Sequence, residues 1–366
     1  MGRLPRVVFA VGVAALLGAV GLSRCTAVDH ADGDAEVVAS GLEVPWGLSF
    51  LPTGDALVGE RMTGDIYQIP AGGGERELVG TVPDVEAIGE GGLLGIAVDP
   101  LFIHDSFVYA YLTTKTDNRI VRFRLDPADP KVYDLEVVLD GIAMAGVHDG
   151  GALAFGPDGM LYAGVGDAGQ PARAQDPDSL NGKILRMDPL GNPPIEDPNP
   201  DPDSLVWSMG HRNVQGLAWD DDGRLWATEF GQNAFDEVNL IEPGSNYGWP
   251  DVEGVGDDPR YVNPQVTWTT DEASPSGAAF LDGALYVGAL RGQRLWRVPL
   301  DDGEAGEPVA LLEGDYGRLR NVVAGPDGRL WITTSNRDGR GEFDDGDDRV
   351  LRLDPGSAGR GGVGAP

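Results

Sequence analysis

The sequence of 366 residues contains a single cysteine, Cys25, and only three lysines. One cysteine excludes an intramolecular disulfide framework and a cysteine-ligated zinc site. Basic residues are scarce as a class, because 27 Lys and Arg stand against 59 Asp and Glu, which gives a net charge of −32. So acidic a chain is not expected to bind nucleic acid or an anionic membrane surface by general electrostatic attraction.

The fingerprints of several enzyme classes are also missing. There is no Gly-x-Ser-x-Gly elbow, and the glycine run at 72–74 lies in a polar turn instead of opening a helix, which disfavours a serine hydrolase and a phosphate cradle. The residues in good supply are glycine, with 55 copies, proline, with 27, and tryptophan, with eight. Frequent turns combined with 41% hydrophobic residues favour an all-β fold over disorder.

The N-terminus has the pattern of an export signal. Arg3 and Arg6 precede an apolar run at 7–22 that is short for a membrane span, so residues 1–25 are predicted to be a signal peptide or lipoprotein signal. Cys25 stands where a lipidated cysteine would, although Arg24 replaces the small residue expected before it. Lipidation, ordinary cleavage and a retained anchor stay open, and each predicts work in the periplasm or outside the cell. Residues 26–35 are interpreted as a tether.

The remaining chain repeats one motif, an aromatic residue followed by a turn with Asp-Gly and then by Leu and a second aromatic residue. Each copy is interpreted as a strand, a tight turn in which glycine tolerates positive φ, and a second strand. A degenerate copy lies at 92–111. The other copies occupy residues 50–57, 155–162, 219–226, 280–286 and 324–331.

Six copies spaced by about 45 to 65 residues predict a six-bladed β-propeller with four-stranded antiparallel blades over residues 36–354. Residues 36–39 are expected to supply the strand that completes the last blade and closes the ring. A β-sandwich or a parallel β-helix would need shorter or more uniform repeats. Residues 355–366 are predicted to be a flexible tail.

Unusual polar residues gather just before the repeats, where a propeller presents its loops at one end of the central channel. These segments lie at 89–94, 147–151, 210–216, 236–241, 244–250, 289–292 and 317–321. In this order they resemble the soluble quinoprotein glucose/sorbosone dehydrogenase family, which includes aldose sugar dehydrogenases that use pyrroloquinoline quinone (PQQ). The resemblance covers residues 40–354. It implies an exported enzyme that oxidises aldoses at C1 to lactones, transfers hydride to PQQ and passes electrons to a periplasmic or membrane acceptor, a cytochrome or quinone.

Arginines in these segments suit the three carboxylates that PQQ carries. Arg318 and Arg320 alternate on one predicted strand and are expected to face the same side, while Arg291 arrives from the preceding blade. A guanidinium group binds carboxylates in a bidentate manner and does not deprotonate. The alternative is that these arginines pair with surface Asp and Glu. Their grouping at the blade mouths favours cofactor binding.

His148 is the candidate general base, because an imidazole accepts a hydroxyl proton near neutral pH. The resemblance implies that it takes the proton of the anomeric hydroxyl. Asp167 would hold the imidazolium and fix its tautomer, or it is only a turn residue. Arg212 would stabilise charge on the quinone oxygens and Asn213 would hydrogen-bond the cofactor, whereas the neighbouring histidine at 211 is expected to be structural.

Glu90 stands where the family often has a glutamine that contacts cofactor and sugar. A carboxylate beside a trianionic cofactor is unfavourable unless it is protonated, paired or turned toward the sugar.

Calcium is the metal that the resemblance implies, and hard oxygen ligands suit it. One ion would be held by the backbone oxygens of Gly231 and Gln232 at the quinone. A second, structural ion would lie near Glu237 and Tyr247.

Two other functions compete with this interpretation. A metal-dependent propeller lactonase would place carboxylates around one metal, and the arginines argue against it. A non-catalytic propeller binding protein would keep the scaffold without redox activity. The particular sugar, the natural electron acceptor and the oligomeric state stay open at this point, since fold alone does not license an activity.

Overall fold

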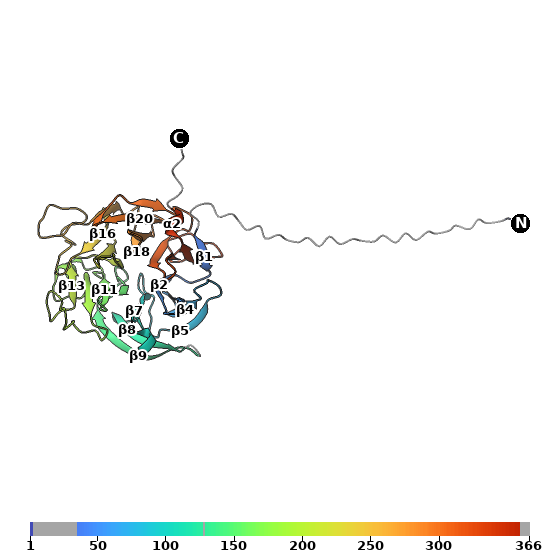
Figure 1. Cartoon of the computed structure of the whole chain (residues 1–366), viewed down its shortest axis with the longest axis horizontal. Coiled ribbons are helices and arrows are strands. Elements are labelled where there is room, and N and C mark those ends of the chain that lie inside the picture. The colour runs from blue at the N-terminus through green and yellow to red at the C-terminus, as the bar shows by residue number, and fades with distance from the viewer. Residues whose placement is uncertain (3–34, 127–128, 359–366) are drawn as a thin grey trace, which may run out of the picture. The chain divides into compact units, whose positions relative to one another are not determined.

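The computed structural model describes residues 1–2, 35–126 and 129–358. The predicted export signal and tether therefore lie almost wholly outside the described residues, as does the predicted tail beyond residue 358. Among the described residues, no helix has the length and apolar character needed to cross a membrane. From residue 35 onward the described chain forms six β-sheets around one axis (Figure 1).

Five blades follow one another along the chain, and their strands pair antiparallel in sequence order. The first two blades contain β2 (Pro45–Phe50), β3 (Ala56–Glu60), β4 (Asp65–Ile69) and β5 (Glu77–Thr81), then β6 (Leu93–Val98), β7 (Phe107–Thr113), β8 (Asn118–Asp126) and β9 (Asp129–Ile142). The third and fourth contain β10 (Ala152–Phe155), β11 (Leu161–Val165), β12 (Lys183–Met187) and β13 (Val206–Met209), then β14 (Val214–Trp219), β15 (Leu225–Glu229), β16 (Phe235–Ile241) and β17 (Val266–Thr269). The fifth contains β18 (Pro275–Leu281), β19 (Ala284–Ala289), β20 (Arg294–Asp301), β21 (Glu304–Ala305) and β22 (Val309–Leu311).

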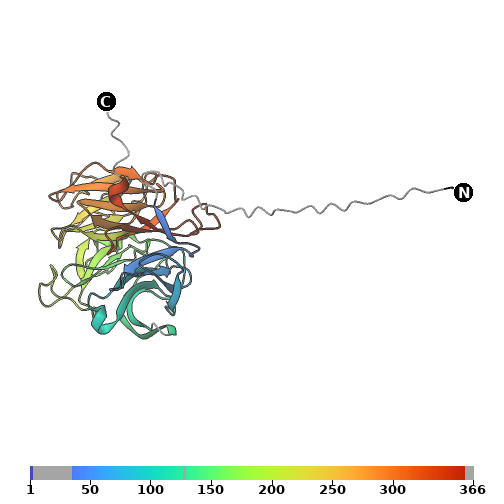
Figure 2. The same ribbon diagram turned by 45° about the vertical axis from the view of Figure 1, so that its right-hand side comes forward.

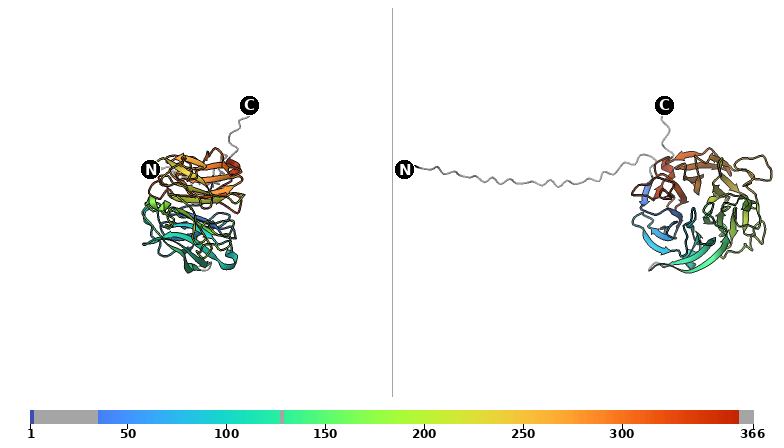
Figure 3. Two further views of the ribbon diagram at one scale, coloured as in Figure 1. Left: turned by 90° about the vertical axis from the view of Figure 1, so that its left-hand side faces the viewer. Right: turned by 180° about the vertical axis from the view of Figure 1, so that it is seen from behind.

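The sixth blade joins the two ends of the ring. β23 (Leu319–Ala324), β24 (Leu330–Thr334) and β25 (Val350–Leu353) come from the end of the chain, and β1 (Glu36–Ala39) pairs antiparallel with β25. Figures 2 and 3 show β1, in blue, beside the red strands of this blade. The predicted six-bladed propeller and its closing strand are thus confirmed.

Two details differ from the expected pattern. The fifth blade has five strands instead of four, because the long β20 pairs with β21 at one end and with β22 at the other. A short helix, α2 (Pro355–Ala358), occupies the start of the segment predicted to be a tail. The other short helices are α1 (Phe102–Asp105) and a 3₁₀ turn at Pro171–Gln175.

The repeated motif has a physical reason in the turn that joins the first two strands of a blade. Gly159 and Gly328 have φ values of 75° and 74°, which other residues adopt only with strain. The preceding aspartate then receives the polar hydrogen of the motif's last aromatic residue: Tyr162 donates to Asp158, and the indole of Trp331 donates to Asp327. In these two hairpins the spacing from Asp to the aromatic residue therefore lets the second strand bond back to the turn.

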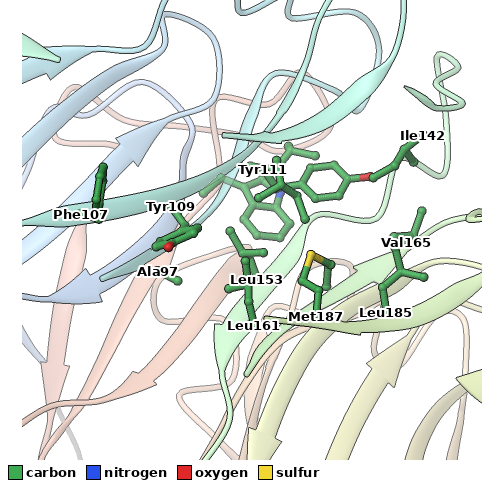
Figure 4. Packing of buried hydrophobic residues seen from close by; sticks show 14 residues of the cluster. Ala97, Phe107, Tyr109, Tyr111, Ile142, Leu153, Leu161, Val165, Leu185 and Met187 are labelled. Carbon is green, nitrogen blue, oxygen red and sulfur yellow. The ribbon is translucent and has the colours of Figure 1, made fainter. Parts of the chain in front are cut away.

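The blades are held together by apolar side chains between neighbouring sheets. Figure 4 shows one such layer, where Tyr109 and Tyr111 of the second blade meet Leu153, Leu161 and Met187 of the third. All five are buried. Their hydroxyls do not stay unsatisfied, since both tyrosines donate to backbone carbonyls across the blade boundary.

The innermost strands β2, β6, β10, β14, β18 and β23 contact one another in a closed cycle. They line a cavity of about 350 Å³, whose wall combines small residues such as Gly95, Ala154 and Ala278 with larger apolar ones such as Leu153. Small side chains are required because six strands converge on one axis. The loops that precede these strands all open at the same end of the ring, and that end carries the candidate site.

Candidate functional site

A pocket of about 410 Å³ lies where the inner strands begin. Its walls come from the loops before β6, β10, β14, β18 and β23, from the start of β16, and from the loops β15–β16, β19–β20 and β24–β25. Ring closure thus gathers residues separated by up to 250 positions. Seven of the predicted site residues line it: Glu90, His148, Arg212, Gly231, Gln232, Arg291 and Arg318. The remaining lining residues are Phe230, Asp236, Thr270, Ser274, Leu290 and Arg340.

His148 is held in one orientation by Asp167. Its Nδ1 lies 2.7 Å from Asp167 Oδ1, and the Asp167 side chain is fully buried. A carboxylate only accepts here, so Nδ1 carries the proton and the other ring nitrogen, Nε2, is left as the acceptor. The backbone of His148 has φ of 58°, an uncommon conformation for a residue other than glycine. Its N–H donates to Glu90 Oε2 at 2.8 Å, which helps to hold that conformation.

Trp249 forms a further layer behind this pair. Its indole N–H donates to Asp167 Oδ2 at 2.8 Å, and the guanidinium of Arg212 lies 5.5 Å from its ring. Asp167 therefore accepts from His148 through one oxygen and from Trp249 through the other. The sequence places Trp249 in the segment 244–250 but predicts no role for it, and only its position in that segment could have indicated one.

The arginines fall into two groups. Arg318 is buried and pairs with Asp338 at 2.9 Å, and the exposed Arg291 pairs with Asp271. Arg320 is buried below the pocket and has no ion pair in the described part of the chain. Arg318 thus lines the pocket and pairs with a carboxylate, whereas Arg320, among the described residues, does neither, although the sequence suggested equivalent positions.

Arg320 bonds only to neutral groups. Its Nη1 donates to Gln215 Oε1 at 2.9 Å and to Ser276 Oγ at 3.2 Å, and its guanidinium lies over the ring of Trp46. Burial lowers the pKa of Arg320. A buried cation without a carboxylate partner is unfavourable by itself, which makes it a natural receptor for an anion.

Three buried donor atoms around the pocket have no acceptor among the described residues. They are Arg212 Nε, Arg320 Nε and Asn213 Nδ2. Asn213 is oriented by its other atom, since its Oδ1 accepts from Gly150 N and Gln215 Nε2. Buried donors are rarely left unpaired, so this set fits a ligand that is rich in acceptor oxygens, as PQQ is.

Glu90 is paired, which is one of the three arrangements that the sequence left open for it. Its Oε1 accepts from Arg340 Nη2 at 3.0 Å, while Oε2 accepts from His148 N. Burial alone would raise the pKa of Glu90, but these two donors hold it below its usual value. Arg340 was not predicted, because it lies in the loop between β24 and β25, 250 residues away.

Gly231 and Gln232 lie on the pocket wall beside Asp236. Neither of their carbonyl oxygens accepts a hydrogen bond in the described part of the chain, whereas Asp236 accepts from Gly231 N and Ser274 N. Burial raises the pKa of Asp236 to about 6. Two free carbonyl oxygens beside a carboxylate make a donor set that fits calcium.

The second predicted metal position is a small enclosed void lined by Glu229, Glu237 and Tyr247, among others. Burial and the nearby charge of Glu229 raise the pKa of Glu237 to about 8. The Tyr247 hydroxyl is already used, because it donates to Leu240 O at 2.6 Å. No group of three or more His, Cys, Asp or Glu side chains in the described ranges has an arrangement that could hold a metal. A cation here would depend on two carboxylates and backbone oxygens.

The histidine at 211 is buried and does not line the pocket. Its Nε2 lies 2.8 Å from Ser208 Oγ, and its ring stacks on Tyr247. These contacts agree with the structural role that the sequence suggested for it.

Comparison with known proteins gives a consistent result. Residues 42–343 match the family model of glucose/sorbosone dehydrogenases. The structure of the PQQ-bound aldose sugar dehydrogenase of Streptomyces coelicolor is similar, with a TM-score of 0.84 and 51% identity over 88% of this chain and 98% of that one. A putative oxidoreductase (glucose dehydrogenase) of Thermus thermophilus gives a TM-score of 0.81 and 45% identity over 88% and 99%. The aldose sugar dehydrogenase of Escherichia coli is 29% identical, over 84% of this chain and 91% of its own.

Proposed function

Because the chain belongs to the glucose/sorbosone dehydrogenase family, we propose that it is an exported enzyme that oxidises aldoses at C1 to lactones with PQQ and calcium. The observation that carries the proposal is the buried guanidinium of Arg320, which has no carboxylate partner in the described chain and lies below a pocket that contains His148. The similarity to a PQQ-bound aldose sugar dehydrogenase supports the choice of cofactor.

Different residues around the pocket would contact different groups of the cofactor. Arg291, Arg318 and Arg320 would face its carboxylates, and Arg212 and Asn213 would donate to its quinone oxygens. Gly231 and Gln232 would hold the calcium ion through their carbonyl oxygens. When bound, PQQ supplies an o-quinone that accepts the hydride from C1 of the sugar.

The protein's own part in the reaction is to move one proton and to control charge. His148 Nε2 takes the proton of the anomeric hydroxyl, and Asp167 stabilises the imidazolium that results. The ion pair of Glu90 with Arg340 neutralises a carboxylate that would otherwise repel an anionic cofactor. The electrons then leave to a cytochrome or quinone acceptor outside the cytoplasm.

Dye reduction by the apo-protein tests this function directly. PQQ is titrated in with calcium and a panel of aldoses, with and without a chelator, and saturable calcium-dependent reduction is expected. His148→Ala should lose roughly 10²- to 10⁴-fold in kcat and still bind PQQ. His104→Ala, an exposed histidine of α1, is the matched control and should behave as wild type.

Two outcomes would contradict the proposal. If wild-type protein does not bind PQQ, the unpaired donors serve another ligand and the dehydrogenase is wrong. If PQQ binds but no aldose is turned over, the chain is a binding protein on this scaffold or acts on other alcohols.

A further inference from the structure

The loop from Gly231 to Phe235 is wrapped around one carboxylate oxygen. Glu253 Oε1 accepts four consecutive backbone N–H groups, from Gln232 at 2.6 Å, Asn233 at 3.0 Å, Ala234 at 3.1 Å and Phe235 at 3.3 Å. Glu253 belongs to the segment between β16 and β17 and does not line the pocket. The carboxylate therefore acts on the loop from behind.

The geometry of the peptide group fixes where the carbonyls of this loop point. In a trans peptide the C=O and the N–H of the next residue point in opposite directions, and neither peptide is cis here. The N–H groups of Gln232 and Asn233 point at Glu253, so the carbonyls of Gly231 and Gln232 point away from it. Both residues lie on the pocket wall, which is the opposite side.

The backbone conformation of this loop requires glycine at position 231. A Cβ atom on Gly231 would lie 1.7 Å from Phe235 O and 2.7 Å from Glu253 Oε1, so only glycine fits. The N–H of Gly231 is held separately by Asp236 Oδ1 at 2.9 Å. Every N–H from 231 to 235 is thus bound to a carboxylate.

We propose that Glu253 is the positioning residue of the pocket's cation site. By holding the N–H groups of the loop it keeps two carbonyl oxygens aimed into the pocket, and so it sets the affinity for calcium without contacting the ion. The inference rests on the proposed function, which takes Gly231 and Gln232 as calcium ligands. Its physical basis is that a prearranged ligand set loses little conformational freedom on binding, and that partners behind the ligands tune affinity in metal sites.

The test uses the full chain with PQQ and measures calcium affinity through the change in the cofactor's absorption as the ion is titrated. Glu253→Ala should weaken calcium binding by roughly 10- to 100-fold. Glu253→Gln keeps one acceptor oxygen and should recover part of the affinity. Asp258→Asn, a surface carboxylate in the same segment that pairs with Arg260, is the control and should match wild type.

Hydrogen exchange of the amides at 232–235, without metal, gives a second measurement. Faster exchange in Glu253→Ala together with calcium-independent PQQ binding equal to wild type is expected, because the arginines are untouched. If wild type binds calcium and Glu253→Ala binds it equally well, the inference is overturned while the proposed function stands. If wild type itself shows no calcium response with PQQ bound, the calcium part of the proposed function fails and the inference falls with it. Should Glu253→Ala not fold, an affinity of Glu253→Gln equal to that of wild type overturns the inference.

Discussion

The two ends of the inner strands are built from the same repeat and differ in almost every chemical property. Where the strands begin, the loops carry histidine, arginines and carboxylates around an open pocket. Toward their other ends, the same strands line the channel with alanine, glycine and aliphatic side chains and finish in aromatic residues such as Phe155, Trp219 and Phe280. The crowded axis restricts side chains within the ring, whereas the entry loops have room for long ones. A blade can thus keep its sheet constant and vary its chemistry at one end alone.

The ends also differ in what lies behind them. At the pocket, two polar groups are fixed by a buried carboxylate behind them: His148 by Asp167, and Arg318 by Asp338. In the channel, small side chains need no such support, because the sheet itself holds them. Arg320 lies between the two regions. It is buried, as the channel residues are, and it is charged, as the pocket residues are.

The largest expected effect comes from replacing Arg320 by an apolar residue like those that line the channel. Arg320→Met removes a buried cation and should weaken PQQ binding by about 4 kcal/mol, roughly 1000-fold, because the cofactor's carboxylate loses a desolvated partner. The free energy of unfolding without cofactor should not fall, since an apolar side chain replaces an unpaired buried charge. Cofactor titration and urea denaturation measure the two effects.

Phe280→Leu is the control from the far end of the channel. It should cost about 1 kcal/mol of folding stability and leave PQQ affinity unchanged. If Arg320→Met binds PQQ as tightly as wild type, Arg320 contributes only to packing within the propeller.

The next effect concerns stability and pH. Asp149 is buried beside the pocket, where its Oδ1 accepts from Asn118 and Ala145, and burial raises its pKa to about 6 from an unfolded value of 3.8. Between these values the folded chain binds the extra proton, so the free energy of unfolding falls as pH rises from about 4 to 6. Asp149→Asn cannot bind or lose this proton, so its free energy of unfolding should not fall over this range. Relative to wild type it should rise by up to about 3 kcal/mol between pH 4 and 6.

Urea denaturation at a series of pH values measures this difference. Ser49→Ala, a neutral change on the channel wall in β2, should differ from wild type by the same amount at every pH. If the difference in unfolding free energy between Asp149→Asn and wild type is the same at every pH, titration of the Asp149 carboxylate does not lower the stability of the fold.

The smallest effect concerns the deeper layer. Trp249→Phe keeps the ring and removes the N–H that Asp167 accepts, so Asp167 should attract the proton on His148 more strongly. The expected result is a fall of roughly tenfold in kcat with KM unchanged, and an acid limb of the pH–rate profile that moves to higher pH. Trp296→Phe removes an indole N–H that has no partner in the described chain and should leave kinetics as they are. An unchanged pH profile in Trp249→Phe would contradict a positioning role.

The fold was predictable from the sequence because its information is local and repeated. A turn glycine recurs in five of the six hairpins, in four of them after an aspartate and before an aromatic residue, and the strand at 36–39 had no other sheet to join. The extra strand of the fifth blade was not predictable, since β21 is only two residues long and follows no repeat.

The pocket was predictable only in part. Residues that directly precede an inner strand, such as His148 and Arg318, could be placed from the repeat. Arg340 and Glu253 could not, because they lie in loops between outer strands whose paths no periodicity describes. The pairing of Arg318 with Asp338 was missed for the same reason. Ring closure brings Arg340 to Glu90, whereas Asp338 and Glu253 reach their partners through loops of the same blade.

The pairing of β1 with β25 also determines when, during synthesis of the chain, the ring can close. Val37 pairs with Leu351, so more than three hundred residues must be made before this contact exists. Until then the last blade lacks its outer strand and the ring has two unsealed faces. Contacts so distant in sequence form slowly. A nascent chain of this architecture therefore closes its ring only after β25 has been synthesised.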